Sequence, residues 1–311
     1  MMNTLRGVLA LLLMLINTMI GLIPMMIVAV AKVLVPWAAF RRVCARIVMT
    51  IAETWAHINR AILGRLLDTR WEVRGDPRVS RDKSYLLLSN HQSWVDIAAL
   101  VQVFNRRVPY YKFFLKQELV WVPLLGLAFW ALDYPFMKRY SREYLEKHPE
   151  MKDRDLEVTR RACEKCRGIP VTVVNFPEGT RFTPAKHHKQ QSPYRHLLRP
   201  KAGGISFVMA SIGDQIDGVL DVSVIYPDGV PGFWDFLSNQ VKRVVVEVHQ
   251  FPLDQQWVRG DYRNDPQFRR EFQQWLSDFW LEKDQRIEAL RQEYGMSPVP
   301  EPEYRDSPSA D

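Results

Sequence analysis

The chain has 311 residues, a formal net charge of +7, 47% hydrophobic residues and 12% aromatic residues. This composition supports a substantial core and excludes a wholly disordered chain. The positive charge favours anionic partners such as phosphorylated carriers, lipid surfaces or nucleic acid, without choosing among them. Three cysteines cannot complete a set of disulfide pairs, which fits a reducing compartment.

The amino-terminal part of the chain has the composition of a membrane segment. Residues 7–31 contain no charged side chain, and a helix needs about 20 apolar residues to span a bilayer. Gly21 and Pro24 interrupt the run, so a kinked transmembrane helix and a re-entrant helical hairpin are both compatible with it. A cleavable signal peptide would have a shorter apolar run. We predict a membrane anchor over residues 1–42.

Basic residues follow the apolar run and orient it in the bilayer. They are Lys32, Arg41, Arg42 and Arg46. Because cytoplasmic flanks carry an excess of Lys and Arg, everything downstream is expected in the cytoplasm. We therefore expect an integral protein of a bacterial cytoplasmic (inner) membrane, with the downstream domain facing the cytoplasm.

An amphipathic helix is predicted over residues 43–67. Its large apolar residues recur at helical spacing and are Ile47, Ile51, Trp55, Ile58 and Ile62. This face could lie in the membrane interface or cover the core of the following domain.

Residues 68–296 alternate β-rich and helix-like stretches. The predicted strands are 71–74, 85–89, 171–176, 219–226 and 241–251, and the predicted helices include 94–104, 155–167 and 203–211. Such alternation indicates an α/β domain with a mixed sheet flanked by helices. A final helix should begin at Asp265 and Pro266, a capping residue followed by proline at the first helical position. Residues 297–311 are rich in Pro, Glu, Asp and Ser, and we expect a disordered tail.

The first candidate site lies where the predicted strand 85–89 ends. His91 follows that strand, and Asp96 lies five residues further on. On one continuous helix the two would be about 140° apart, so they meet only if His91 lies in the turn and Asp96 in the first helical turn. A carboxylate there can fix the histidine tautomer and leave the other ring nitrogen as a general base.

Spacing alone does not identify this pair. The same spacing occurs in His148–Asp153, within a charged run, and in His249–Asp254, where Pro252 follows a strand. Only His91 lies between an apolar strand and an apolar helix, so we predict that it is the base.

The second candidate site lies where the predicted strand 171–176 ends. Gly179 permits close approach of a ligand to the backbone, and Arg181 offers a guanidinium suited to phosphate. Ligands of α/β sheets commonly bind at strand exits of this kind.

Together the two turns resemble the motif pair of the glycerolipid acyltransferase family, the lysophosphatidate acyltransferases. The first motif is Asn-His-x4-Asp from Asn90, and the second is Phe-Pro-Glu-Gly-Thr-Arg from Phe176. The likeness extends over about residues 85–251. Further similar positions are Lys116, Pro123, Gly126, residues 136–139 and residues 222–227. Residues 196–201, 231–236 and 282–284 resemble the branch related to lysocardiolipin enzymes. Phe182 stands where a serine often follows the second motif.

The resemblance implies transfer of a fatty acyl group from acyl-CoA or acyl carrier protein to the free hydroxyl of a lysophospholipid in a bilayer. His91 is then the base and Asp96 orients it, while Arg139 and Arg181 hold the acceptor phosphate. The remaining positions assigned to substrate binding are Glu178, Gly179, Thr180, Lys116 and Lys201. No bound cofactor, metal or nucleic acid is expected.

Two alternatives remain compatible with the sequence. One is a transacylase that takes its acyl chain from another phospholipid. The other is a non-catalytic membrane protein that binds RNA or a partner through a basic face, although no nucleic-acid motif is recognisable. Residues 182–213 contain no Asp or Glu but five Lys and Arg residues. This segment suits carrier phosphates or anionic headgroups, or is a solvated basic loop.

Overall fold

The computed structural model describes residues 2–113, 115–134, 136–137 and 167–297. The predicted tail lies outside these residues except for Ser297, as does the predicted helix over 155–167 except for Arg167. Of the three histidine–aspartate spacings, His148–Asp153 also falls outside them.

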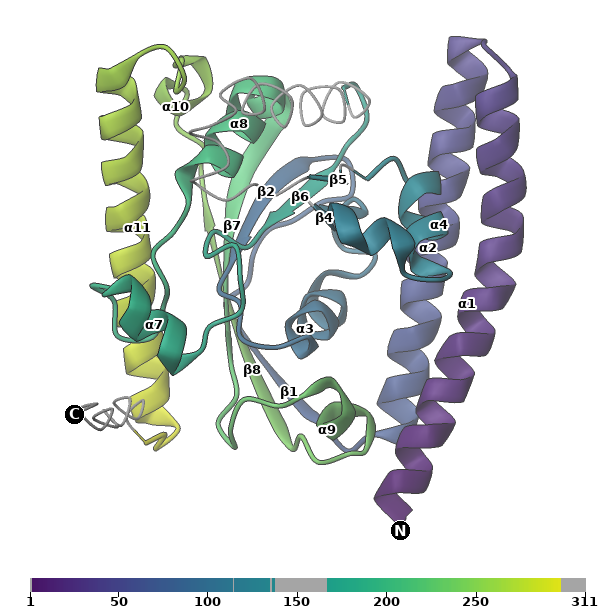
Figure 1. Cartoon of the computed structure of the whole chain (residues 1–311), viewed down its shortest axis with the longest axis horizontal. Helices are drawn as coiled ribbons and strands as arrows, with labels where there is room; N and C mark the ends of the chain where they lie inside the picture. Colours follow the sequence, from purple (N-terminus) through teal and green to yellow (C-terminus); the bar gives the residue numbers. More distant parts are fainter. Residues whose placement is uncertain (1, 114, 135, 138–166, 298–311) are drawn as a thin grey trace, which may run out of the picture.

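A six-stranded mixed sheet forms the centre of the domain (Figure 1). Its strand order is β1-β8-β7-β2-β6-β3, in which only β7 and β8 pair antiparallel. The strands are β1 (Arg70–Arg74), β2 (Ser84–Ser89), β3 (Tyr111–Phe113), β6 (Thr172–Asn175), β7 (Ile216–Ile225) and β8 (Arg243–Phe251). Two short strands, β4 (Leu115–Lys116) and β5 (Phe136–Met137), pair separately. The mixed α/β sheet predicted from the sequence is confirmed.

The two faces of the sheet are covered by different helices. Side chains of β2 alternate between the faces, as the period of a strand requires. Tyr85 and Leu87 pack with α3 (Val95–Phe104), whereas Leu86 and Leu88 pack with the apolar residues of α8 (Ala202–Ile212) and α11 (Pro266–Glu293). The other helices described in the α/β domain are short: η1 (Gln117–Trp121), α4 (Leu125–Ala131), α7 (Pro184–Gln190), η2 (Gly213–Gln215), α9 (Phe233–Leu237) and α10 (Gln256–Arg259).

Helix α11 begins where the sequence predicted. Asp265 is the N-cap and accepts the backbone N–H of Gln267 (2.8 Å) and Phe268 (3.0 Å), with Pro266 as the first helical residue. Its buried side extends from Phe272 to Leu290 and includes two charged residues. The buried residues are Phe272, Leu276, Trp280, Lys283, Asp284, Ile287 and Leu290.

Two long helices stand beside the domain as a hairpin, α1 (Met2–Leu34) and α2 (Ala38–Leu66) (Figure 1). Helix α1 continues through Gly21 and Pro24, so the turn of the hairpin lies after residue 34 and not within the apolar run. Polar groups join the two helices: Asn17 Nδ2 donates to Asn59 Oδ1 (2.8 Å), and Trp55 Nε1 donates to Thr18 Oγ1 (3.0 Å). The anchor and the predicted amphipathic helix therefore pack together.

The buried side of α2 differs from the predicted apolar face. Ile47 and Ile58 are exposed, whereas Val48, Ala52 and Ala56 are buried. Ile51, from the middle of the predicted face, packs against the apolar cluster that contains Val48, Ala52, Leu132 and Tyr134.

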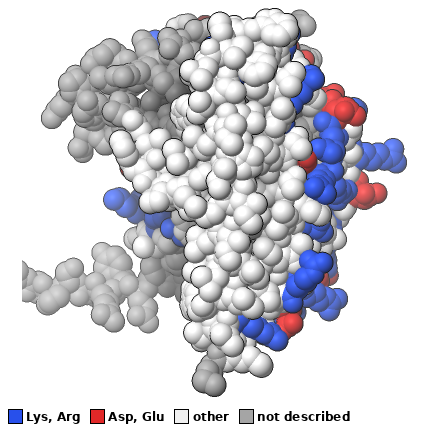
Figure 2. Space-filling view, turned by 90° about the vertical axis from the view of Figure 1, so that its right-hand side faces the viewer, with Lys and Arg blue, Asp and Glu red and all other residues white. Residues whose placement is uncertain are grey.

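Helix α1 contacts the α/β domain near both of its ends. Arg6 forms an ion pair with Asp68 (2.8 Å), and Lys32 forms one with Asp133 (2.6 Å). Between these ends, large apolar side chains remain exposed, among them Ile16, Ile20, Ile23 and Ile27. Figure 2 shows this side as a surface nearly free of charge, with charged residues gathered along one edge. Within the described residues, α1 is the helix long and apolar enough to cross a membrane.

Candidate active site

The first turn brings His91 and Asp96 together. Strand β2 ends at Ser89 and α3 begins at Val95, so the intervening turn folds the histidine back over the start of the helix. His91 Nδ1 lies 2.7 Å from Asp96 Oδ2, which makes Nδ1 the proton-bearing nitrogen. Nε2 is then the nitrogen left for a substrate. The histidine side chain is 18% exposed and the aspartate is fully buried.

The buried carboxylate of Asp96 is stabilised by further donors. Its Oδ2 accepts the backbone N–H of Gln92 (2.7 Å) and Ser93 (2.9 Å), as the carboxylate of a residue in the first turn of a helix can do. Its Oδ1 accepts the hydroxyl of Tyr226 (2.5 Å). Burial raises the pKa of Tyr226 well above its ordinary value, and the neighbouring Asp96 charge adds to this, so the phenol keeps its proton and remains a donor.

The side chain of Asn90 ties the same turn to β7. Its Nδ2 donates to Val224 O (2.9 Å), and its Oδ1 accepts the Val224 N–H (2.8 Å). The asparagine of the first motif therefore extends the pairing of β2 with β7 by one residue beyond Ser89. Neither Tyr226 nor Asn90 was assigned to the site from the sequence, because their contacts join strands about 130 residues apart.

The second turn packs directly against the first. The ring of Phe176 stacks on His91, with centroids 4.3 Å apart and planes 24° from parallel. Phe182 N donates to His91 O (2.7 Å), which closes the second turn over the first. The two motifs, about 85 residues apart in the sequence, thus form one site because β2 and β6 are parallel neighbours.

Glu178 was predicted to contact substrate, but both of its oxygens are occupied inside the fold. Oε1 accepts the His91 N–H (2.8 Å) and Oε2 accepts the Leu198 N–H (2.9 Å). The residue is fully buried, and this burial raises the pKa of its carboxyl to about 8. Its carboxyl group therefore acts on the site by holding the backbone N–H of His91.

Gly179, Thr180 and Lys201 lie together at the surface of the second turn. Gly179 has φ +69°, and a Cβ atom there would lie 3.2 Å from Lys201 Nζ, so glycine permits both the turn and the approach of the lysine. Lys201 N also donates to Pro177 O (2.8 Å). Thr180 Oγ1 accepts a hydrogen bond from Lys186 Nζ (2.8 Å), a lysine of the basic segment.

Arg181 lies at the mouth of the site. Its guanidinium carbon is 5.3 Å from the ring centroid of Trp94, a half-exposed residue between His91 and Asp96 in the chain. This cation–π contact holds the charge beside the dyad while leaving the guanidinium exposed.

Two predicted substrate residues are not placed by these contacts. Arg139 lies outside the described residues. The backbone of Lys116 belongs to β4 and pairs in register with Met137 of β5, two residues before Arg139 in the chain.

His249 and Asp254, which have the same spacing as His91 and Asp96, do not form a dyad. His249 lies on β8 beside Glu247, with Nε2 and Oε2 3.1 Å apart. Asp254 instead accepts the backbone N–H of Gln256 (3.0 Å).

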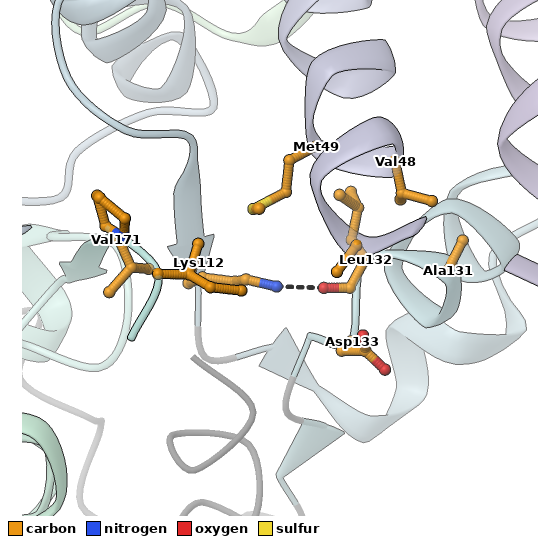
Figure 3. A pocket seen from close by; sticks show the side chains of 10 residues that line it. Val48, Met49, Lys112, Ala131, Leu132, Asp133 and Val171 are labelled. Atoms are coloured by element: carbon orange, nitrogen blue, oxygen red, sulfur yellow. Dashed lines mark hydrogen bonds between the residues drawn. The ribbon is translucent and has the colours of Figure 1, made fainter. Parts of the chain in front are cut away.

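A small cavity lies at the opposite end of the sheet from the dyad (Figure 3). Its wall includes Val171, which precedes β6, whereas His91 and Glu178 follow the carboxyl ends of β2 and β6. Lys112 Nζ donates to the carbonyl of Leu132 at its rim. The cavity is therefore separate from the reacting groups.

The raised pKa of Glu178 predicts a pH-dependent contribution to stability. The folded protein retains a proton on this carboxyl that the unfolded chain releases near pH 4.5, so stability should fall as pH rises from about 4.5 to about 8. Glu178→Gln removes the titrating group and keeps the shape. In thermal unfolding of the purified protein, the wild type should lose roughly 1 kcal/mol per pH unit relative to this variant inside that window. Parallel curves for the two proteins would contradict the assignment.

Comparisons with known proteins identify the family of the chain. The sequence model of a family described as Acyltransferase matches residues 70–227. Lysocardiolipin acyltransferase 1 of Mus musculus is 25% identical over 260 residues, covering 78% of this chain and 63% of the relative. The 1-acyl-sn-glycerol-3-phosphate acyltransferase epsilon of Mus musculus is 25% identical over 234 residues, covering 70% of this chain and 60% of the relative.

One solved structure is also similar, the 1-acyl-sn-glycerophosphate (LPA) acyltransferase PlsC from Thermotoga maritima. It is 20% identical, with a TM-score of 0.49, and the match covers 91% of this chain and 98% of that one. The chain spans about three fifths of the length of the Mus musculus lysocardiolipin relative. Since the family model matches half of the chain, the protein belongs to the acyltransferase family that its two motifs predicted.

Proposed function

We propose that this protein transfers a fatty acyl group from a thioester, acyl-CoA or acyl carrier protein, to the free hydroxyl of a lysophospholipid. The observation that carries the proposal is the His91–Asp96 pair at the end of β2, with Nε2 left for the acceptor. The relatives named for lysocardiolipin and 1-acyl-sn-glycerol-3-phosphate support an acceptor of the lysophospholipid class.

The proposed reaction needs one proton carrier. His91 Nε2 takes the proton of the acceptor hydroxyl as that oxygen attacks the thioester carbonyl carbon. The resulting imidazolium is stabilised by the carboxylate of Asp96, which already accepts the Nδ1 proton. When the carbon–sulfur bond breaks, the imidazolium returns the proton to the leaving thiolate, and the ester and free thiol are released.

Arg181 is proposed to hold the acceptor phosphate. Its position over Trp94 places a cation next to the dyad without an acidic partner among its described contacts. A phosphate there would bring the attached glycerol hydroxyl toward Nε2. Arg139 keeps the same predicted role.

The apolar side of α1 is proposed to hold the protein on the membrane. Because both ends of the helix contact the α/β domain, this geometry favours a helix embedded along the membrane surface over one that crosses the bilayer. The lipid acceptor would then enter the site without leaving the membrane. A bacterial inner membrane and a cytoplasmic domain remain predictions.

Loss of His91 should abolish acyl transfer. Removing a positioned general base lowers the rate by about 10²–10⁴, so His91→Ala should fall in that range. Asp96→Asn should be severely impaired, because an amide cannot stabilise the imidazolium. The measurement is transfer of labelled acyl groups from acyl-CoA to lysophosphatidate, normalised to folded protein.

His249→Ala is the matched control for this experiment and should retain most activity, since its aspartate at the same spacing does not contact it. Near-normal transfer by His91→Ala would contradict the proposal. Transfer that requires a second phospholipid and no thioester would identify a transacylase.

Arg181→Ala should weaken use of the acceptor more than use of the donor. Loss of a charge-assisted contact to phosphate costs on the order of 1.5–3 kcal/mol, about ten- to a hundredfold in the acceptor KM. Lys189→Ala removes an exposed charge from the basic segment that follows Arg181, residues 182–213. This variant should change neither the acceptor KM nor the donor KM. A raised donor KM with an unchanged acceptor KM would move Arg181 to the carrier site.

Charges placed on the exposed side of α1 should release the protein from membranes. Ile20→Lys and Ile23→Lys combined insert two charges where the side chains are 66% and 62% exposed. This variant should move to the soluble fraction at alkaline carbonate, while the wild type stays with the membrane. Gln274→Lys, on the exposed side of α11 across the sheet, is the control. Equal retention of all three proteins would contradict membrane binding through this side.

A further inference from the structure

A buried lysine lies on the face of the sheet opposite α3. Lys283 of α11 is fully buried, which is rare for lysine unless its charge is paired. Its Nζ donates to Asp221 Oδ1 (2.6 Å), Val222 O (2.6 Å) and Ser223 Oγ (3.1 Å). These three acceptors use all three donors of the ammonium.

Lys283 therefore fixes one short segment of β7 in three places. Asp221 is itself fully buried and also pairs with Arg286 (2.7 Å), so its carboxylate is shared by two cations of α11. Asp221 and Ser223 face α11, while the intervening Val222 faces α3. The carbonyl of Val222 adds a contact to the backbone itself.

The same strand supports the dyad immediately beyond this segment. Val224, one residue after Ser223, exchanges two hydrogen bonds with the side chain of Asn90, which precedes His91. Tyr226, two residues further on, donates to Asp96. Any displacement of this part of β7 would reach both members of the dyad.

A second route runs from α11 through the loop at residues 195–198. Asp284 accepts the backbone N–H of Arg195 (2.7 Å) and His196 (2.8 Å). Trp280 Nε1 donates to the carbonyl of Leu198 (3.1 Å), and the N–H of Leu198 donates to Glu178. Since Glu178 also holds the backbone N–H of His91, α11 supports the histidine from this side as well.

The two routes are also linked by charge. Burial raises the pKa of the Glu178 carboxyl, and the charge of Lys283 acts against that rise.

We infer that Lys283 is a positioning residue of the acyl-transfer site, which holds β7 so that Asn90 and Tyr226 keep His91 and Asp96 in reacting geometry. This inference rests on the proposed function. Helix α11 lies outside residues 70–227, the stretch that the family model matches. The support is thus supplied by the carboxyl-terminal part of this chain.

A purely structural role would not require a charge at this position. Replacing both members of a buried ion pair by apolar side chains is often neutral for stability, whereas removing the lysine alone leaves the buried charge of Asp221 paired with Arg286 and lowers stability. The variants are therefore compared per folded protein. What an apolar side chain cannot supply is three directed hydrogen bonds to one strand segment. The loss should therefore appear in the geometry of the site.

The test compares Lys283→Met, which keeps the length of the side chain, with Leu276→Ala, which opens a cavity in the buried side of the same helix. Leu276 packs in the apolar cluster with α8, which contains no residue of 89–96. We expect Lys283→Met to lower kcat at least tenfold, with the KM of donor and acceptor within about threefold. Leu276→Ala should lower the unfolding temperature and leave kcat per folded protein unchanged.

Hydrogen exchange supplies a readout that needs no substrate. Peptides covering residues 89–96 should exchange faster in Lys283→Met than in the wild type, and at the wild-type rate in Leu276→Ala. If the wild type transfers no acyl group, the proposed function fails, and this exchange comparison alone decides the positioning role. A kcat within twofold of wild type together with unchanged exchange at residues 89–96 would overturn it.

If Lys283→Met does not fold, Asp221→Asn replaces it in both measurements. That variant keeps the lysine and the shape of its partner but removes the charge of the acceptor, so it should lower kcat and speed exchange in the same peptides. Wild-type kcat and exchange in Asp221→Asn would overturn the inference.

Discussion

The site depends on a carboxylate that is completely withdrawn from water. Four groups donate hydrogen bonds to Asp96: the His91 ring, the backbone of Gln92 and Ser93, and the hydroxyl of Tyr226. An unpaired buried charge would be too costly to keep. Each donor also constrains the position of its own element, so the pairing that stabilises the charge also fixes the turn, the start of α3 and the end of β7 relative to one another.

The surrounding architecture brings those donors to one place. Parallel pairing of β2 with both β6 and β7 directs the ends of all three strands to the same edge of the sheet. The turn after β6 then stacks Phe176 on the histidine and inserts Glu178 beneath it. Glu178 is unusual because its carboxyl joins two backbone amides from different segments at a fully buried position. Glu178, a residue of the second motif, therefore serves the site through the protein backbone.

The α1–α2 hairpin and α11 lie on opposite faces of the sheet and differ in the side chains that they present. On one face the α1–α2 hairpin presents exposed apolar side chains beside the domain that carries the dyad. On the other face α11 inserts Lys283 and Asp284 into the fold, where they contact β7 and the loop at residues 195–198. An apolar exterior on one side and directed polar contacts on the other suit the proposed reaction, in which the site receives a lipid acceptor and His91 carries a proton.

The sequence by itself determined the class of fold, the family and the two turns that form the site. Strand and helix periods are local, and so are the cap at Asp265 and the motifs at Asn90 and Phe176, so each can be recognised within about ten residues. Only the tertiary structure decided which residues hold these motifs in place. Tyr226 and Lys283 lie in two stretches that resemble the family, residues 222–227 and 282–284. Their partners, however, lie 130 and about 60 residues away in the chain. The contacts of Glu178 and the buried side of α2 could not be derived from the sequence for the same reason. Burial and hydrogen-bond partners are set by contacts between distant segments, which no local pattern specifies.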